Sequence, residues 1–277
     1  MPFRHRLKWI AGVIIGWVLF SAARPALAGD TVYLPLVSNG FAAAPQPPAD
    51  KNDTLAYVNY YRALAGVPAV TFDATLNSNC LEGARYIAQT GIMRHDQSGS
   101  PAGLACVSQG NIWMGFGSGW EPADTVDSWM GSVGHRLWLI YPTTPTFGYG
   151  FYTEASVPRS GAALDVLSTF ANDGASYPGW PIRYPAAGQS GVPATAYPVT
   201  LSWRYFGSAP ALGAASLTTS GGTPLALTSS TNLSANHKGV QLTPTSALPA
   251  NTQINVSISG TYDGAPFSYS WSFTTGN

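Results

Sequence analysis

The segment VDSWMGSVGHR, residues 126–136, decides how the middle of the chain folds. Pro122 lies just before it and suits the first turn of a helix, where its missing N–H would be unpaired anyway. Apolar residues then recur at helical spacing, which predicts a helix over about 122–130. His135 follows this helix and is a candidate functional residue. Arg136 is expected to be a structural anchor.

Two further helices are predicted upstream of this segment. Asp53 and Asp73 each precede an apolar-periodic stretch, at the position of an N-cap. Gly66 and Gly91 follow the last periodic residues and end these helices. The stretch 96–118 is rich in Gly, Ser and Gln and is predicted to be a loop.

Strand patterns begin downstream of the segment. Residues 147–153 and 163–170 are predicted strands, and 158–161 is the turn between them. Three helices followed by strands do not make a βαβ alternation. The order predicts an α+β domain, residues 53–172, with helices packed on an antiparallel sheet.

The composition changes at about residue 173. A connector, 173–198, is crowded with Pro and Gly. Short alternating stretches follow over 199–277, with turn residues that include Asn251 and the pair Asp263-Gly264. The predicted strands are 200–205, 225–228, 240–242, 253–259 and 267–273. Evenly spaced strands without helix signals predict a small all-β sandwich.

The first 28 residues have the layout of a secretory signal: a basic start, an apolar run, and Ala26-Leu27-Ala28 at the cleavage point. The apolar run is shorter than a membrane span, which needs about 20 residues. Residues 29–52 are predicted to be an extended leader and Pro-rich linker. We expect a secreted, extracellular protein with no stable membrane span after cleavage. The whole sequence has 13 basic and 13 acidic residues, and four of the basic ones lie in residues 1–28, so residues 29–277 carry a formal charge of 9 − 13 = −4, which does not favour nucleic-acid binding.

Cys80 and Cys106 are the two cysteines of the chain. In an oxidising compartment they are expected to form a disulfide, although two separate buried thiols are the alternative. In the chain-entropy model such a bond stabilises by roughly 3–4 kcal/mol.

Three histidines follow the signal sequence. His95 and His135 are 40 positions apart, too far for a local metal motif, so their spacing does not say whether they meet. His237 lies in Ala-Asn-His-Lys and is predicted to be a surface residue in a turn.

Several motifs in order resemble those of the CAP superfamily, the SCP-like extracellular domain. The match covers about 120 residues. The motifs are the first-helix stretch 58–68, the stretch Phe72-Asp73-Ala74-Thr75-Leu76, the tripeptide Gly110-Asn111-Ile112, the segment 126–136 and the strand Gly148-Tyr149-Gly150. The C-terminal stretches 242–252 and 269–275 are similar to bacterial Ig-like domains. The resemblance implies a CAP α-β-α sandwich followed by an Ig-like spacer, in a bacterial protein.

The resemblance also implies a ligand cleft marked by His95 and His135, with Gln109, Asn111 and Ser132 beside them. The ligand expected is a small molecule, lipid, glycan or cell-surface group. Two imidazoles with a carboxylate and water make an ordinary site for a divalent metal such as Zn. The alternative function is therefore a metal-assisted extracellular hydrolase that uses both histidines.

This sequence departs from the family at the glutamate of its Gly-Glu-Asn motif, which is Gly110 here. Asp127 and Glu121 are the candidate substitutes. A second enzymatic alternative pairs Ser132 with His135 as nucleophile and base, but no nucleophile elbow surrounds the serine. The competing interpretation is that Ser132 caps or ends the helix by hydrogen-bonding backbone groups.

The segment 113–120 is rich in Trp, Phe and Gly and is expected beside the cleft. Its aromatic rings either stack on a ligand or pack a Gly-rich loop over the sheet. The sequence therefore favours a binding module over an enzyme, and it names no catalytic residue.

Overall fold

The computed structural model describes residues 45–170 and 173–277. The predicted signal sequence 1–28 and most of the predicted leader 29–52 lie outside the described residues. Within the described part of the chain, no helix combines the length and the apolar character needed to cross a membrane.

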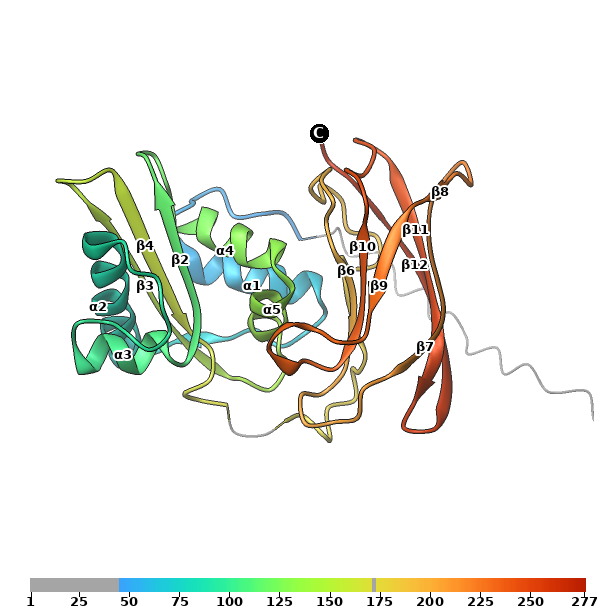
Figure 1. The fold of residues 1–277 in the computed structure, drawn as a ribbon, viewed down its shortest axis with the longest axis horizontal. Helices are drawn as coiled ribbons and strands as arrows, with labels where there is room; N and C mark the ends of the chain where they lie inside the picture. The colour runs from blue at the N-terminus through green and yellow to red at the C-terminus, as the bar shows by residue number, and fades with distance from the viewer. Residues whose placement is uncertain (1–44, 171–172) are drawn as a thin grey trace, which may run out of the picture. The chain divides into compact units, whose positions relative to one another are not determined.

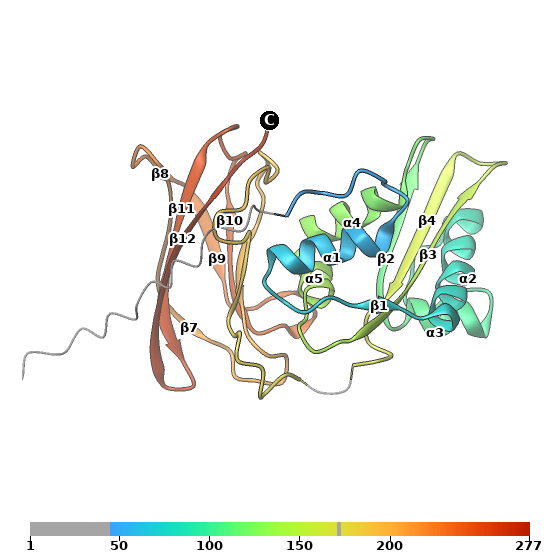
Figure 2. The same cartoon turned by 180° about the vertical axis from the view of Figure 1, so that it is seen from behind.

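A four-stranded sheet with the order β1-β3-β4-β2 forms the middle layer of the N-terminal half. Its strands are β1 (Thr71–Phe72), β2 (Gly110–Phe116), β3 (Thr146–Glu154) and β4 (Arg159–Asp165). The helices are α1 (Thr54–Leu64), α2 (Ala74–Thr90), α3 (Pro101–Val107), α4 (Pro122–Gly131) and α5 (Val133–Leu139). Helices α2 and α3 lie on one side of the sheet, and α1, α4 and α5 lie on the other (Figures 1 and 2). The predicted α-β-α sandwich is confirmed.

The predicted helix starts are also confirmed. The Asp53 carboxylate accepts a hydrogen bond from the N–H of Ala56 at 2.9 Å, and that of Asp73 accepts one from Leu76 at 2.9 Å. Helix α2 ends at Gly91, whose φ of 72° lies in the left-handed region that favours glycine. Local capping chemistry therefore fixes where α1 and α2 begin and where α2 ends.

The prediction of a loop over 96–118 is wrong, because α3 and β2 both lie within it. Ser100 caps α3 by accepting a hydrogen bond from the N–H of Gly103 at 3.0 Å, and Pro101 occupies the first turn. Strand β2 pairs antiparallel with β4 along its whole length. Residues 110–116 show little alternation of apolar and polar side chains. They form a strand because they pair with β4.

Two other boundaries differ from the prediction. Helix α5 follows α4 after the single residue Ser132, and its seven residues are too few to show a helical period. The β3–β4 turn occupies 155–158, so β4 begins at Arg159, earlier than the predicted strand over 163–170. Strands β2 and β3 both pair antiparallel with β4, while the short β1 runs parallel to β3.

The expected disulfide is confirmed. Cys80 of α2 and Cys106 of α3 are bonded, with their Cα atoms 5.0 Å apart. Both side chains are buried, and the bond joins the two helices on the same face of the sheet.

Two four-stranded sheets make up the C-terminal half. One has the order β5-β6-β10-β9 and the other β12-β11-β7-β8. The strands are β5 (Ile182–Tyr184), β6 (Val199–Ser202), β7 (Ala211–Thr219), β8 (Pro224–Leu225), β9 (Leu227–Ser230), β10 (Gly239–Pro244), β11 (Gln253–Tyr262) and β12 (Ala265–Thr274). A short 3-10 turn, η1 (Ser234–Asn236), lies between β9 and β10. The predicted all-β sandwich is confirmed.

Turn chemistry decides the longest hairpin of this sandwich. Tyr262 pairs with Ala265, so Asp263 and Gly264 are its two loop residues. Both have positive φ, 49° and 77°, as the favoured two-residue turn requires. The sequence prediction missed β7, in which only Leu217 is buried, and β5, which lies inside the predicted connector 173–198.

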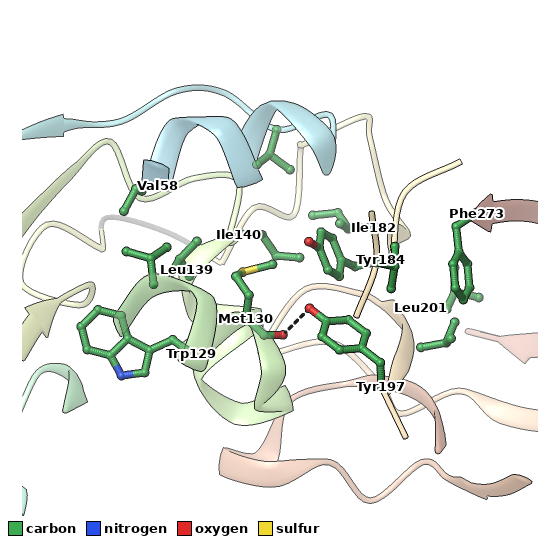
Figure 3. Packing of buried hydrophobic residues seen from close by; sticks show 14 of the residues in the cluster. Val58, Trp129, Met130, Leu139, Ile140, Ile182, Tyr184, Tyr197, Leu201 and Phe273 are labelled. Carbon is green, nitrogen blue, oxygen red and sulfur yellow. Dashed lines mark hydrogen bonds between the residues drawn. The ribbon is translucent and has the colours of Figure 1, made fainter. Parts of the chain in front are cut away.

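One apolar core continues from the first half into the second. All described residues belong to one contact unit. Trp129 and Met130 of α4 share a buried cluster with Tyr184, Leu201 and other residues of the β-sandwich (Figure 3). Buried residues of α4 and α5 therefore belong to the same apolar core as those of the β-sandwich.

The buried side chain of Arg136 is the polar counterpart of this core. Its Nε donates to the carbonyl of Met130 at 2.6 Å, and its Nη1 donates to the carbonyl of Pro198 at 2.7 Å. The guanidinium carbon lies 4.9 Å from the ring centre of Tyr184 and 4.7 Å from that of Tyr197. The Tyr197 hydroxyl donates to the Met130 carbonyl as well, at 2.9 Å (Figure 3). Arg136 is thus the structural anchor that the sequence predicts.

Replacing Arg136 tests how much this anchor stabilises the fold. We expect Arg136→Ala to lower the free energy of unfolding by about 2–4 kcal/mol, because it removes the donor to the Pro198 carbonyl, leaves the Met130 carbonyl with the Tyr197 hydroxyl alone, and opens a cavity. Urea denaturation of both proteins measures the difference. Arg85→Ala is the matched control, since Arg85 is half-exposed and, among the residues that the structure describes, pairs with the Glu82 carboxylate and the ring of Tyr152. Equal losses in the two variants would contradict the assignment.

Candidate functional site

A pocket of about 390 Å³ lies where α5, the start of β2 and the segment after β4 meet the β9–β10 loop. Its lining is His95, Ser108, Gly110, Asn111, Ser132, Gly134, His135, Trp138, Leu167, Ser234 and Ala235. The volume falls within the ~300–1,000 Å³ typical of small-molecule sites. Four of the five predicted cleft residues therefore line one cavity, and Gln109 is the exception.

His95 enters the pocket from the segment between α2 and α3. Its Nδ1 lies 2.6 Å from the carbonyl oxygen of Val107, the last residue of α3. A carbonyl only accepts hydrogen bonds, so Nδ1 carries the proton and donates it. In the neutral ring, Nε2 is then the hydrogen-bond acceptor. Contact with α3 thus fixes which nitrogen of His95 can serve a ligand.

His135 lies in the first turn of α5 and is half-buried. Burial lowers the pKa of its imidazole below the usual value, and the charge of His95 lowers this pKa further. His135 is accordingly uncharged at neutral pH. The Asn111 side chain donates to the His135 carbonyl at 3.1 Å and so holds the start of β2 against α5.

Gln109 serves the site through its backbone. Its carbonyl accepts hydrogen bonds from the N–H groups of Val166 and Leu167, at 3.0 and 3.1 Å. These bonds hold the segment after β4 next to β2, which places Leu167 at the pocket. The predicted cleft residue is therefore adjacent to the pocket without lining it by its side chain.

Gly110 stands where no larger residue fits. A Cβ at this position would overlap the carbonyl oxygen of Leu164 and lie 3.0 Å from the amide nitrogen of Val166. Both are backbone atoms of the paired β4 strand and its continuation, so they cannot turn aside as a side chain would. The family glutamate is thus excluded here by the geometry of the backbone.

The two acids expected to replace that glutamate lie elsewhere. Asp127 accepts a hydrogen bond from the Tyr61 hydroxyl at 2.6 Å, and Glu121 forms an ion pair with Lys51 at 3.1 Å. Neither lines the pocket. Neither candidate is therefore placed to complete a metal site at this pocket.

Asp165, at the end of β4, is a buried carboxylate, but its oxygens are already used. They accept hydrogen bonds from the N–H groups of Leu167 and Ser168 and from the Ser168 hydroxyl. Within the described ranges, no group of three His, Cys, Asp or Glu side chains is placed to hold a metal ion. Two imidazoles without a carboxylate do not fit the tetrahedral zinc sites of proteins, which have at least three protein ligands.

Ser132 separates α4 from α5. Its N–H donates to the carbonyl of Trp129 at 3.1 Å, and its own carbonyl accepts from the N–H of Arg136 at 2.8 Å. Ser132 therefore ends α4 and begins α5, as predicted, but through its backbone, because its side chain makes no capping hydrogen bond. The hydroxyl is exposed at the pocket, and no acid lines that pocket beside His135 to orient it, as a nucleophile–base pair requires.

The prediction of His237 as a surface residue is also wrong. Its exposed fraction is 3%, and its ring packs 4.4 Å from that of Trp138 and 5.3 Å from that of Tyr205. Burial lowers its pKa to about 3, and the charge of Lys238 acts in the same direction. The residue is in a turn, as predicted, but this turn packs against α5.

The aromatic segment 113–120 lies away from the pocket. Strand β2 starts at Gly110 in the pocket and reaches Phe116 roughly 20 Å farther on, at ~3.3 Å per residue. There the rings of Trp113 and Trp120 meet edge to face at 5.1 Å, and the Trp120 indole donates to the carbonyl of Phe116. The expected place beside the cleft is wrong.

Two family models match the chain. The model of the cysteine-rich secretory protein family, CAP, matches residues 55–159, and the bacterial Ig-like domain model matches residues 183–275. The chain carries a CAP domain followed by a bacterial Ig-like domain. No sequence of a curated protein matches it.

The CAP domain supplies most of the pocket, and the Ig-like domain supplies Ser234 and Ala235. Sequence reasoning missed these two residues, and it missed Ser108, Trp138 and Leu167 as well. The two residues of the Ig-like domain lie about 100 positions from His135, in a loop with no motif that points to the CAP domain. Only the packing of one domain on the other brings them together.

Gly110 offers a direct test of the excluded glutamate. We expect Gly110→Glu to lower the free energy of unfolding by about 1–3 kcal/mol, because the strand pairing must shift to admit a side chain. Gln109→Glu places the same carboxylate one residue earlier and should stay within about 0.5 kcal/mol of the wild type. Urea denaturation measures both. A Gly110→Glu protein that is as stable as the wild type and binds one Zn²⁺ would refute the geometric exclusion.

The low pKa of His237 predicts a loss of stability in acid. In the unfolded chain, His237 becomes protonated as the pH falls below its usual pKa of ~6.5. In the folded chain, it stays unprotonated until about pH 3. The unfolded state therefore binds more protons in this window, and stability falls as the pH is lowered. Between pH 7 and 4.5 the wild type should lose about 2–3 kcal/mol more than His237→Phe, measured by urea denaturation. Parallel losses would show that the ring titrates freely.

Proposed function

We propose that this chain is a secreted bacterial CAP-domain protein that binds a small or surface-attached ligand in the pocket marked by His95 and His135. The amino-terminal layout of residues 1–28 supports export, and the disulfide between Cys80 and Cys106 suits an oxidising compartment. Binding, rather than turnover, is the proposed activity of the pocket.

The observation that carries this proposal is a two-histidine pocket without an acid. Among its lining residues are seven with hydrogen-bonding side chains, the Trp138 indole included, and none carries a carboxylate, an ammonium or a guanidinium group. His135 is uncharged at neutral pH because burial lowers its pKa. Such a lining can hold and orient a ligand by hydrogen bonds, but it has no carboxylate to activate water.

The metal-assisted hydrolase is the second candidate, since His95 and His135 do line one cavity. A metal there would supply a Lewis acid and an activated water. Both imidazoles are available for this, but Gly110 cannot bear the carboxylate, and the alternatives Asp127 and Glu121 are engaged elsewhere. The residues present are therefore sufficient for binding, whereas the hydrolase would also need a carboxylate that the pocket lacks.

Histidine-labelled protein tests the binding function. The protein is collected from the culture medium, where its N-terminus should be Gly29 if export and cleavage occur. NMR signals of His95 and His135 are followed during titration with neutral oligosaccharides, acidic oligosaccharides and phospholipid vesicles. We expect one class to shift both signals. His95→Ala with His135→Ala should then weaken binding of that class at least tenfold, about 1.4 kcal/mol or more.

Gln109→Ala is the matched control, because Gln109 is next to the pocket and its side chain does not line it. It should leave the affinity unchanged. Titration with Zn²⁺ under the same conditions separates the two candidate functions. One tightly bound Zn²⁺ that is lost in the double histidine variant would support the hydrolase and contradict the binding module, as would a histidine pair that responds to no ligand class.

A further inference from the structure

The loop between β9 and β10, residues 231–238, extends from the Ig-like domain to α5 of the CAP domain. Figure 1 shows this loop beside α5. Its residues Ser234 and Ala235 line the same pocket as His95 and His135. A Cβ on Gly134 would be only 3.0 Å from the Cβ of Ser234. The absence of a side chain at Gly134 is what lets the loop come this near.

Apolar and aromatic contacts hold the loop in place on both sides of these two residues. Before them, Leu233 is buried in a cluster with Val133 and Leu137 of α5. After them, the ring of His237 packs 4.4 Å from the ring of Trp138, which itself lines the pocket. The pair Ser234 and Ala235 is thus fixed at the pocket from both ends.

The backbone of this loop is strained. Ala235 and Asn236 have φ of 54° and 59°, in the left-handed region. Asparagine tolerates this region, but for alanine it is uncommon and costs free energy. Strained residues persist where the surrounding contacts determine them, and such residues cluster at ligand sites. The fold therefore stabilises an unfavourable conformation at the point where the loop meets the pocket.

The lining also specifies the chemistry of a ligand. Ser108, Asn111, Ser132, His135 and Ser234 present uncharged donors and acceptors, and His95 presents its second ring nitrogen. An alkyl chain would leave these groups without partners, and a charged group would find no opposite charge to offset its desolvation. Hydroxyl groups, each both donor and acceptor, match such a lining, and the Trp138 ring and Leu167 give it an apolar side. This pattern is that of a site for an uncharged, hydroxyl-rich molecule.

We propose that the pocket is a composite saccharide site in which the β9–β10 loop of the Ig-like domain forms one wall and determines which neutral glycans fit. This inference rests on the proposed binding function and adds the ligand class and the second domain's part in it. The Ig-like domain then has a role in recognition besides that of a spacer.

A single engineered thiol tests the wall. Both cysteines of the chain are bonded to each other, so Ser234→Cys creates one reactive site. Serine to cysteine is nearly isosteric, which avoids a folding defect. The probes are cellotetraose, chitotetraose and maltotetraose, with tetragalacturonate as the charged counterpart and phosphatidylcholine vesicles as the lipid. Alkylation by N-ethylmaleimide is followed by intact mass, and binding by the NMR signals of His95 and His135.

We expect at least one neutral tetrasaccharide to slow the alkylation of Ser234→Cys at least tenfold. The alkylated protein should in turn bind that saccharide at least tenfold more weakly. Ser220→Cys is the matched control, since Ser220 is exposed on the Ig-like domain and does not line the pocket. Its alkylation rate and the affinity of its alkylated form should not change.

Other outcomes separate this inference from the proposed function. A saccharide that shifts His95 and His135 but leaves the alkylation of Ser234→Cys unchanged would overturn the composite wall and keep the binding function. Binding of tetragalacturonate or vesicles alone would overturn the neutral saccharide class and again keep the function. If no probe shifts either histidine, both the proposed function and this inference fail.

Discussion

The buried guanidinium of Arg136 is the interaction on which the rest of the structure depends. It sits between the rings of Tyr184 and Tyr197 and donates to carbonyls from both domains. Its immediate neighbour in α5 is His135, which faces the pocket. Because the side chain of Arg136 is fixed in the core, the helix that carries His135 has one rotation and one position. The same buried side chain therefore holds the two domains together and fixes the position of His135.

The site differs from the family's expected pattern by more than a missing side chain. Gly110 is paired in register with β4, and the backbone of β4 fills the space that a side chain there would occupy. The nearby Asp165 is used to hold the segment after β4. Both features favour a lining without charge. The pocket is thus internally consistent as a neutral binding site, since strand pairing, loop hydrogen bonds and the lowered pKa of His135 all act in that direction.

Part of this fold could be predicted from the sequence, because helix caps and turns are formed by residues that are close together in the chain. Asp53, Asp73 and the Asp263-Gly264 turn act within four residues of the chain, so their patterns predict the structure directly. Helix α3 and strand β2 could not be found this way, because one is a single capped stretch of seven residues and the other depends on pairing with β4. His237 was misjudged because its polar neighbours in sequence suggest a turn at the surface. Its burial is caused by rings that are distant in sequence, and the same is true of the place of Ser234 in the pocket.

The disulfide between α2 and α3 also bears on when the pocket takes its final form. The two cysteines are 26 positions apart, and His95 lies in the ring that they close. Val107, whose carbonyl orients the His95 ring, directly follows Cys106. Before oxidation, only the packing of the short helix α3 would keep that carbonyl in place. If the protein is exported as proposed, this bond forms only after the chain leaves the reducing environment, and the orientation of His95 is completed there.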